Sequence, residues 1–192
     1  MRLGRNKLFE YIDNKSLLER VISRLSSFKS DIIIVTRQGQ SIPQLSYLGL
    51  RLVADIYSDK GALGGIYTGL VASNSFYNLV VACDMPFLNQ ALLGYMIALS
   101  PGFDVVIPRL GDLVEPLHAI YSKGCLVPME RLLKEGNLKV NDILPLVRVR
   151  YVEAEEMDKF DLKRLSLFNI NTQADLVKAR ELAKKEMSDV KH

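Results

Sequence analysis

The chain has 192 residues, most simply one domain that is long enough to bury a substantial core. Its composition, 48% hydrophobic and 24% charged, is ordinary for a globular protein, and a net charge of +3 is too small to indicate nucleic acid. No apolar run reaches the length of a membrane span, and the charged stretch 1–7 is no signal peptide. Cys83 and Cys125 are too few for a disulfide framework, so we expect reduced thiols and a cytoplasmic protein.

Taken in order, the chain alternates helix signals with strand signals. Ser16 and Glu19 have the spacing of a capping box, and apolar residues follow at helical spacing up to Leu25. Short apolar runs that end at proline, glycine or acidic residues predict strands. The expected strands are 31–36, 50–54, 79–82, 103–108, 115–121, 146–152 and 167–170. The other expected helices are 61–73, 89–99, one that Gly136 ends, a turn at 141–144, and one that Thr172 and Asp175 cap.

This alternation predicts an α/β fold of three layers, with a mostly parallel sheet and helices on both faces. We treat 1–192 as a single domain. Folds of this kind normally open with a strand, whereas this chain opens with a loop and a helix.

The stretch 78–86, Asn-Leu-Val-Val-Ala-Cys-Asp-Met-Pro, organises the rest of the chain. Residues 79–82 predict a central strand buried on both faces, and Pro86 stops it. Asp84 therefore lies at the carboxyl end of that strand, the edge where open α/β sheets bind ligands. A carboxylate there, facing a phosphate-bearing substrate, is a natural Mg²⁺ ligand. The alternative is that Asp84 caps the following helix or closes a turn.

Three further stretches have residues that could take part in chemistry. The glycines of 61–65 lie between a strand and a helix, where backbone amides can receive a phosphate or ribose; the alternative is a plain tight turn. The cations of 2–7 could neutralise a triphosphate; the alternative is a solvated terminus. His118 could be a general base or a polar contact, although a structural histidine is commoner.

Five stretches together resemble a known family over essentially the whole chain. They are Arg2-Leu-Gly-Arg-Asn-Lys7, Gly61-Ala-Leu-Gly-Gly65, Cys83-Asp-Met-Pro86, Glu115-Pro-Leu-His-Ala119 and Asn169-Ile-Asn-Thr172. In this order they resemble the molybdenum cofactor guanylyltransferases of the MobA type. The resemblance implies a single Rossmann-like nucleotidyltransferase domain, similar to the nucleotide-diphospho-sugar transferases. It also implies that GMP passes from GTP to molybdopterin with Mg²⁺, releasing pyrophosphate.

The resemblance assigns roles to particular residues. Lys7 matches a lysine that contacts the nucleotide phosphates, Asp84 matches the Mg²⁺-binding aspartate, and Asp55 matches a nucleotide-contacting acid. Lys7, Arg2 and a metal on Asp84 would supply the charges for catalysis, with help from Arg5. The remaining nucleotide-binding candidates are Gly61, Leu63, Gly64 and Thr36, and those on the molybdopterin side are His118 and Asn171.

Two positions depart from the family pattern. Many relatives read guanine with an asparagine where this chain has Val35 and Thr36. The family signature also begins Leu-Ala-Gly-Gly-x-Ser-x-Arg at the end of a first, central strand, and only its tail is matched, by 2–4. Either translation starts upstream or the strand and phosphate loop have been lost. We favour the first explanation, because Lys7 and the capped helix are intact.

The lack of this strand and loop has two expected consequences. Two strand edges are left unpaired, or the sheet rearranges. The chain as given binds nucleotide weakly and catalyses poorly.

Three functions remain open at this point. The first is guanylyl transfer, with GTP and molybdopterin as substrates and with molybdoenzymes or cofactor-insertion proteins as partners. The second is a molybdopterin cytidylyltransferase or a related nucleotidyltransferase, which Val35 and Thr36 keep open. The third is a non-catalytic protein that binds a nucleotide or a partner. We expect no nucleic-acid and no membrane partner in any of them.

Overall fold

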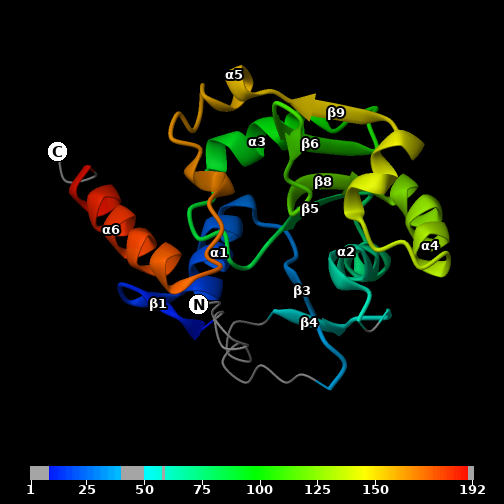
Figure 1. Ribbon diagram of the computed structural model, residues 1–192, viewed down its shortest axis with the longest axis horizontal. Coiled ribbons are helices and arrows are strands. Elements are labelled where there is room, and N and C mark those ends of the chain that lie inside the picture. The colour runs from blue at the N-terminus through cyan, green and yellow to red at the C-terminus, as the bar shows by residue number, and fades with distance from the viewer. Residues whose placement is uncertain (1–8, 40–49, 58, 190–192) are drawn as a thin grey trace.

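The computed structural model describes residues 9–39, 50–57 and 59–189 (Figure 1). Its helices are α1 (Leu17–Leu25), α2 (Gly61–Ala72), α3 (Gln90–Leu99), α4 (Leu126–Lys134), α5 (Ala154–Met157) and α6 (Gln173–Asp189). Its strands are β1 (Tyr11–Ile12), β2 (Lys15–Ser16), β3 (Ile33–Thr36), β4 (Arg51–Ala54), β5 (Tyr77–Val81), β6 (Val105–Leu110), β7 (Leu113–Val114), β8 (His118–Ser122) and β9 (Val149–Val152).

The first and last helices begin at the residues that the sequence predicts. The Ser16 hydroxyl accepts a hydrogen bond from the Glu19 amide at 3.2 Å, and the Glu19 carboxylate accepts one from the Ser16 amide at 2.8 Å. At α6, Thr172 and Asp175 exchange the same two kinds of bond, at 3.2 and 2.8 Å. These reciprocal bonds satisfy amides that have no partner within the helix.

The strands form a larger mixed sheet, a smaller parallel sheet and a separate antiparallel pair of β1 with β2. The larger sheet has the order β5-β8-β6-β7, and β9 pairs with β6. Its pairings are antiparallel except for β6 with β9, while β3 pairs with β4 in parallel. Helices α2 and α4 pack on one face of the larger sheet and α3 on the other. The predicted α/β layering is confirmed, but the strand directions are mixed rather than mostly parallel.

The prediction of a central strand at 79–82 is wrong in one respect. Within the described residues, β5 pairs only with β8 and β3 pairs only with β4, so each has one unpaired edge. All residues of β5 are half-buried rather than buried. These two unpaired edges are the first of the two arrangements that the sequence led us to expect.

Two helices hold the separate sheets together. In α1, Leu18 packs in a cluster with Ile34 of β3, and Val21 packs in a cluster with Leu79 of β5. Helix α2 contacts β3 and β4 directly and shares its own core cluster with Val80 of β5. The carboxyl ends of β4 and β5, which have the candidate acids Asp55 and Asp84 after them, are therefore parts of one packed body.

The structure corrects the strand predictions at Pro108 and at 167–170. Strand β6 runs through Pro108, because pairing with β8 ends at Val106 and pairing with β7 begins at Arg109. Pro108 also pairs with Val152 of β9, and its carbonyl accepts the Glu115 amide at 3.2 Å. The N–H and C=O of one strand residue face the same edge, so the missing N–H of Pro108 faces the break between the β8 and β7 ladders, where proline is tolerated. The stretch 167–170 is no strand: it leaves a short 3₁₀ turn, and the Ile170 amide donates a hydrogen bond to the Asp84 carbonyl at 3.0 Å.

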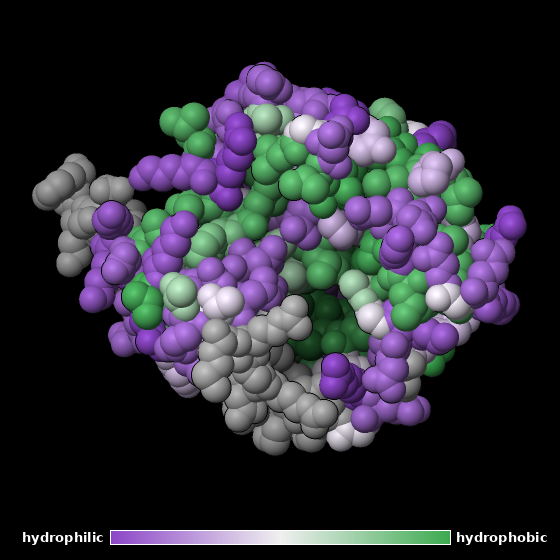
Figure 2. All heavy atoms as spheres, viewed as in Figure 1, coloured by the Kyte–Doolittle hydropathy of each residue, from purple (hydrophilic) through white to green (hydrophobic). Residues whose placement is uncertain are grey.

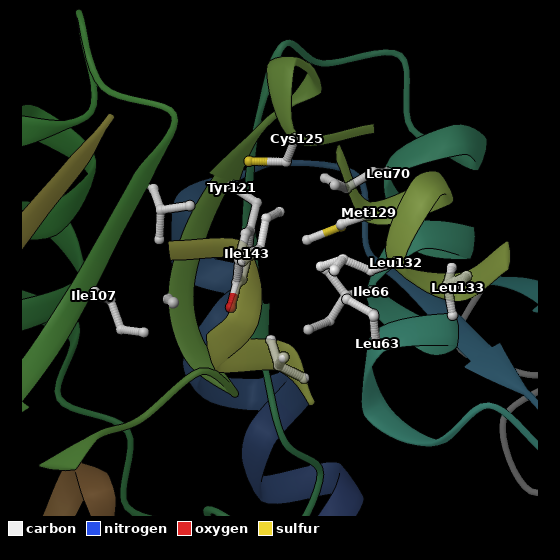
Figure 3. Packing of buried hydrophobic residues seen from close by; sticks show 13 residues of the cluster. Leu63, Ile66, Leu70, Ile107, Tyr121, Cys125, Met129, Leu132, Leu133 and Ile143 are labelled. Atoms are coloured by element: carbon white, nitrogen blue, oxygen red, sulfur yellow. The ribbon is translucent and has the colours of Figure 1, made fainter. Parts of the chain in front are cut away.

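The main hydrophobic core lies between the larger sheet and helices α2 and α4 (Figure 3). Leu63 and Ile66 of α2 lie against Met129 and Leu132 of α4, beside Tyr121 of β8. Among these, Leu63, Met129 and Tyr121 have no exposed surface. No helix in the described part of the chain is long and apolar enough to span a membrane.

A polar cluster beside β9 stabilises the fold at neutral pH and loses this effect at acid pH. The Glu156 carboxylate accepts hydrogen bonds from Arg150 at 2.5 Å, from the Tyr95 hydroxyl at 2.5 Å and from the Glu153 amide at 3.0 Å. The bond from Arg150 is the main reason that the pKa of Glu156 falls from 4.5 to about 2. Because the folded state has the lower pKa, this stabilisation is complete above pH 4.5 and is lost as the pH falls toward 2.

We expect Glu156→Gln to lower the free energy of unfolding at pH 7 by about 2 kcal/mol. The difference from wild type should shrink as the pH falls below 4.5, because Glu156 then takes up a proton in the unfolded chain, which stabilises the unfolded state of the wild type. Urea unfolding at pH 7, 4.5 and 3 measures both effects. Glu155→Gln, an exposed neighbour, is the matched control and should stay close to wild type. A Glu156→Gln difference that is the same at every pH would contradict this account.

Candidate functional site

Asp84 lies in a tight loop directly after β5, and buried side chains hold this loop. Met85 and Leu88 have no exposed surface, and Phe87 is 3% exposed. These anchors leave the Asp84 side chain half-buried at the carboxyl end of the strand. The Asp84 carbonyl accepts the Ile170 amide, so the segment around Asn169 and Asn171 lies beside the loop.

Glu115 is a second carboxylate in this region, and the sequence patterns did not indicate it as a site residue. It is close enough to Asp84 for the two charges to interact. Its Oε1 accepts the Leu117 amide at 3.2 Å, and its Oε2 accepts the Asn169 side-chain amide at 3.5 Å. Burial raises the pKa of the Glu115 carboxyl and the charge of Asp84 raises it further, while the two hydrogen bonds lower it. The Glu-Pro-Leu-His motif was the signal that could have identified it.

The two residues predicted for the molybdopterin side differ in accessibility. Asn171 is exposed, and its backbone amide donates to Asp175 at 3.0 Å in the cap of α6. His118 has no exposed surface, and among the described residues neither of its ring nitrogens has a hydrogen-bond partner. Burial lowers the pKa of His118 from 6.5 to about 4, so the ring is neutral. The structure thus places His118 in the interior of β8, and its role on the molybdopterin side, like that of Asn171, stays a prediction.

Asp55 follows β4, and well-placed donors fix its carboxylate. Its Oδ1 accepts the Tyr57 amide at 3.0 Å and the Thr68 hydroxyl at 2.8 Å. Its own amide donates to the Thr36 carbonyl at 2.7 Å, which ties the exits of β3 and β4 together. Thr36 is only 9% exposed, and its hydroxyl makes one long bond, of 3.5 Å, to the Val53 carbonyl. The structure thus brings two predicted nucleotide-binding residues, Thr36 and Asp55, to one place.

The glycine stretch 61–65 forms the first turn of α2 rather than a separate loop. Gly61 has φ +62°, a left-handed conformation that glycine adopts without strain, and it is exposed at the start of the helix. Gly64 is buried, and a Cβ there would lie 3.1 Å from the Tyr57 carbonyl oxygen. Leu63 is directed into the core (Figure 3). Of the three nucleotide-binding candidates in this stretch, Gly61 is thus the exposed one, while Leu63 and Gly64 are buried where α2 packs against the rest of the protein.

The cations expected at the phosphates, Arg2, Arg5 and Lys7, lie outside the described residues. The residues that could hold a divalent cation are Asp84 and Glu115. The described part of the chain has no group of three or more histidine, cysteine or acidic side chains that could hold a metal. One or two carboxylates are nevertheless the protein ligands that Mg²⁺ uses when a substrate phosphate completes its shell. The donor set therefore fits Mg²⁺ better than a metal that needs a full cage of protein ligands.

This face of the molecule is hollowed, as Figure 2 shows. The hollow lies where Figure 1 has β3 and α2, and hydrophobic residues line its floor. Small-molecule sites are commonly concave and apolar with a few polar groups at the edge.

Comparison with solved structures identifies the fold of the chain. The chain superposes on 2-C-methyl-D-erythritol 4-phosphate cytidylyltransferase from Thermus thermophilus with a TM-score of 0.71, over 96% of this chain and 100% of that chain. At 17% identity this likeness concerns the fold alone, which is the Rossmann-like fold of nucleotidyltransferases.

A family model described as a MobA-like NTP transferase domain matches residues 1–148, and the chain belongs to this family. It is 39% identical to a probable molybdenum cofactor guanylyltransferase of Pelotomaculum thermopropionicum, over 95% of this chain and 87% of that relative. It is 34% identical to a molybdenum cofactor guanylyltransferase of Desulfosudis oleivorans, over 94% and 89%. Among solved structures, molybdopterin-guanine dinucleotide biosynthesis protein A from Archaeoglobus fulgidus is 30% identical with a TM-score of 0.82, over 95% and 92%.

Proposed function

We propose that this chain transfers GMP from GTP to molybdopterin, giving the guanine dinucleotide cofactor and pyrophosphate, and that residues 1–192 act as one nucleotidyltransferase domain. One observation carries the proposal. In a member of this family, the fold brings Asp84, Glu115 and the 169–171 segment together at the end of β5. That is the carboxyl edge of a strand, where α/β folds place their ligands.

The chemistry needs positioning and charge neutralisation more than a covalent nucleophile. A phosphate oxygen of molybdopterin attacks the α-phosphorus of GTP, and the bond from that phosphorus to the departing pyrophosphate breaks. In the proposal, Asp84 and Glu115 hold Mg²⁺, which neutralises charge on the phosphates. Asp55 and the exposed start of α2 at Gly61 hold the nucleoside. Asn171 contacts molybdopterin, and Lys7 and Arg2, assisted by Arg5, neutralise charge on the phosphates.

Cytidylyl transfer is the second candidate, and one feature favours it. The position after Val35 is Thr36, whose short and nearly buried side chain lacks the paired donor and acceptor of an asparagine amide. Base choice is therefore the part of the proposal that most needs a direct test.

A thermal-shift titration with GTP, CTP and ATP, each with and without Mg²⁺, tests binding. A ligand at 100 times its dissociation constant stabilises the native state by about 2.7 kcal/mol. We expect a shift that is selective for GTP and larger with Mg²⁺, at high GTP concentrations if binding is as weak as expected. Pyrophosphate release with molybdopterin present then tests transfer. Selectivity for CTP would favour the second candidate, and no shift with any nucleotide would reject both.

The cellular location and the partner proteins are also proposals. Cys83 and Cys125 are not joined in a disulfide, as expected in a reducing compartment, which supports a cytoplasmic protein. We propose molybdoenzymes or cofactor-insertion proteins as the partners that receive the product.

A further inference from the structure

Thr68 is a buried polar residue in the middle of α2, and its hydroxyl makes two hydrogen bonds to the exit of β4. It has no exposed surface. The hydroxyl donates to Oδ1 of Asp55 at 2.8 Å and accepts the Ile56 amide at 3.0 Å. One side chain of α2 thus holds both the carboxylate and the backbone of the residue that follows it.

These bonds leave the two oxygens of Asp55 in different situations. Oδ1 accepts both hydrogen bonds made to the carboxylate, one from the Thr68 hydroxyl and one from the Tyr57 backbone amide. Among the described residues, none donates a hydrogen bond to Oδ2. Two donors on one oxygen stop the carboxylate from rotating, so Oδ2 has a fixed direction. An acceptor held in this way suits the hydroxyl or N–H donors of a nucleoside, and it loses little freedom on binding.

We propose that Thr68 is a positioning residue that sets the orientation of Asp55 for the nucleotide. The inference rests on the proposed function, because it takes Asp55 as a nucleotide contact. A purely structural threonine would affect the stability of the protein only. A positioning threonine affects the affinity for GTP in molecules that are fully folded, and it does so through Asp55.

Three substitutions of Thr68 test the proposal, with KM for GTP and kcat measured on each. Thr68→Val keeps the shape and removes the hydroxyl, and we expect KM to rise roughly tenfold while kcat changes less than threefold. Thr68→Ser keeps the hydroxyl and should remain within about twofold of wild type. Thr68→Cys, a weaker donor, should fall between them and replaces the valine variant if that variant does not fold. Ser100→Ala removes another buried hydroxyl, which bonds the Ile97 carbonyl at 2.8 Å, and serves as the control.

A double-mutant cycle with Asp55→Asn separates positioning from structure. If Thr68 acts through Asp55, Thr68→Val should add little to the rise in KM that Asp55→Asn already causes. Fully additive effects, or a Thr68→Val enzyme with wild-type KM, would overturn the inference. Wild-type protein that neither binds GTP nor releases pyrophosphate would instead reject the proposed function, so the two failures are distinguishable.

Discussion

Asp84→Asn should lower guanylyl transfer by roughly 10²- to 10³-fold, because the amide cannot replace the charge of a metal-binding carboxylate. The loop around Asp84 should keep its shape, since Met85, Phe87 and Leu88 anchor it in the core and the bond to the Ile170 amide uses the backbone carbonyl. The Mg²⁺-dependent part of the GTP thermal shift should disappear in the variant. Pyrophosphate release and thermal shift, both measured across a Mg²⁺ titration, check the two effects.

The matched control for this prediction is Asp112→Asn. Asp112 is exposed in the turn between β6 and β7, so the substitution makes the same chemical change on the surface. It should leave transfer and the Mg²⁺ response at wild-type levels. An Asp84→Asn enzyme that retains Mg²⁺-dependent transfer would remove Asp84 from the metal site and leave Glu115 as the remaining carboxylate candidate.

Leu63→Ala should lower the free energy of unfolding by about 2–5 kcal/mol, the usual cost of a cavity in a packed core. Leu63 has no exposed surface and packs in the cluster that contains Met129 and Tyr121 (Figure 3). Because the Leu63 side chain has no exposed surface that a ligand could contact, the folded variant should bind GTP within about twofold of wild type. Urea unfolding and a GTP titration below the unfolding midpoint measure these two quantities.

Leu162→Ala is the control for this prediction, since Leu162 is 78% exposed and its truncation should cost less than about 0.5 kcal/mol. A stable Leu63→Ala protein with strongly reduced GTP affinity would restore the family-based role of the Leu63 side chain. Loss of stability without loss of affinity would leave only the backbone near Leu63 as a nucleotide contact.

The local elements of this protein follow from the sequence by itself. The caps of α1 and α6 depend on pairs only three residues apart, such as Ser16 with Glu19, and such pairs can be recognised from spacing. The strand before Asp84 and the helix from Gly61 were also predicted, because apolar runs and glycine punctuation act over a few residues. The fold class followed from the alternation of these elements.

Pairings between distant segments could not be predicted in the same way. Alternation of apolar residues gives a strand its two faces, but it does not show which strand lies beside it. Hence β5 was expected at the centre of the sheet, whereas in the described residues it has one unpaired edge. For the same reason the sequence did not show that His118 would be wholly enclosed.

The residues of the candidate site can be divided in the same way, into those that the sequence indicates and those that only the structure shows. Asp84 and Asp55 were identified from their positions after strands and from the family motifs, whereas their neighbours were not. Glu115 accepts a hydrogen bond from Asn169, which is 54 residues away in the sequence. Thr68 of α2 donates one to Asp55, which is 13 residues away. The sequence by itself determined which residues end the strands. Only the tertiary structure decided which side chains meet there, because hydrogen bonds between distant segments form only after the helices have packed against the sheets.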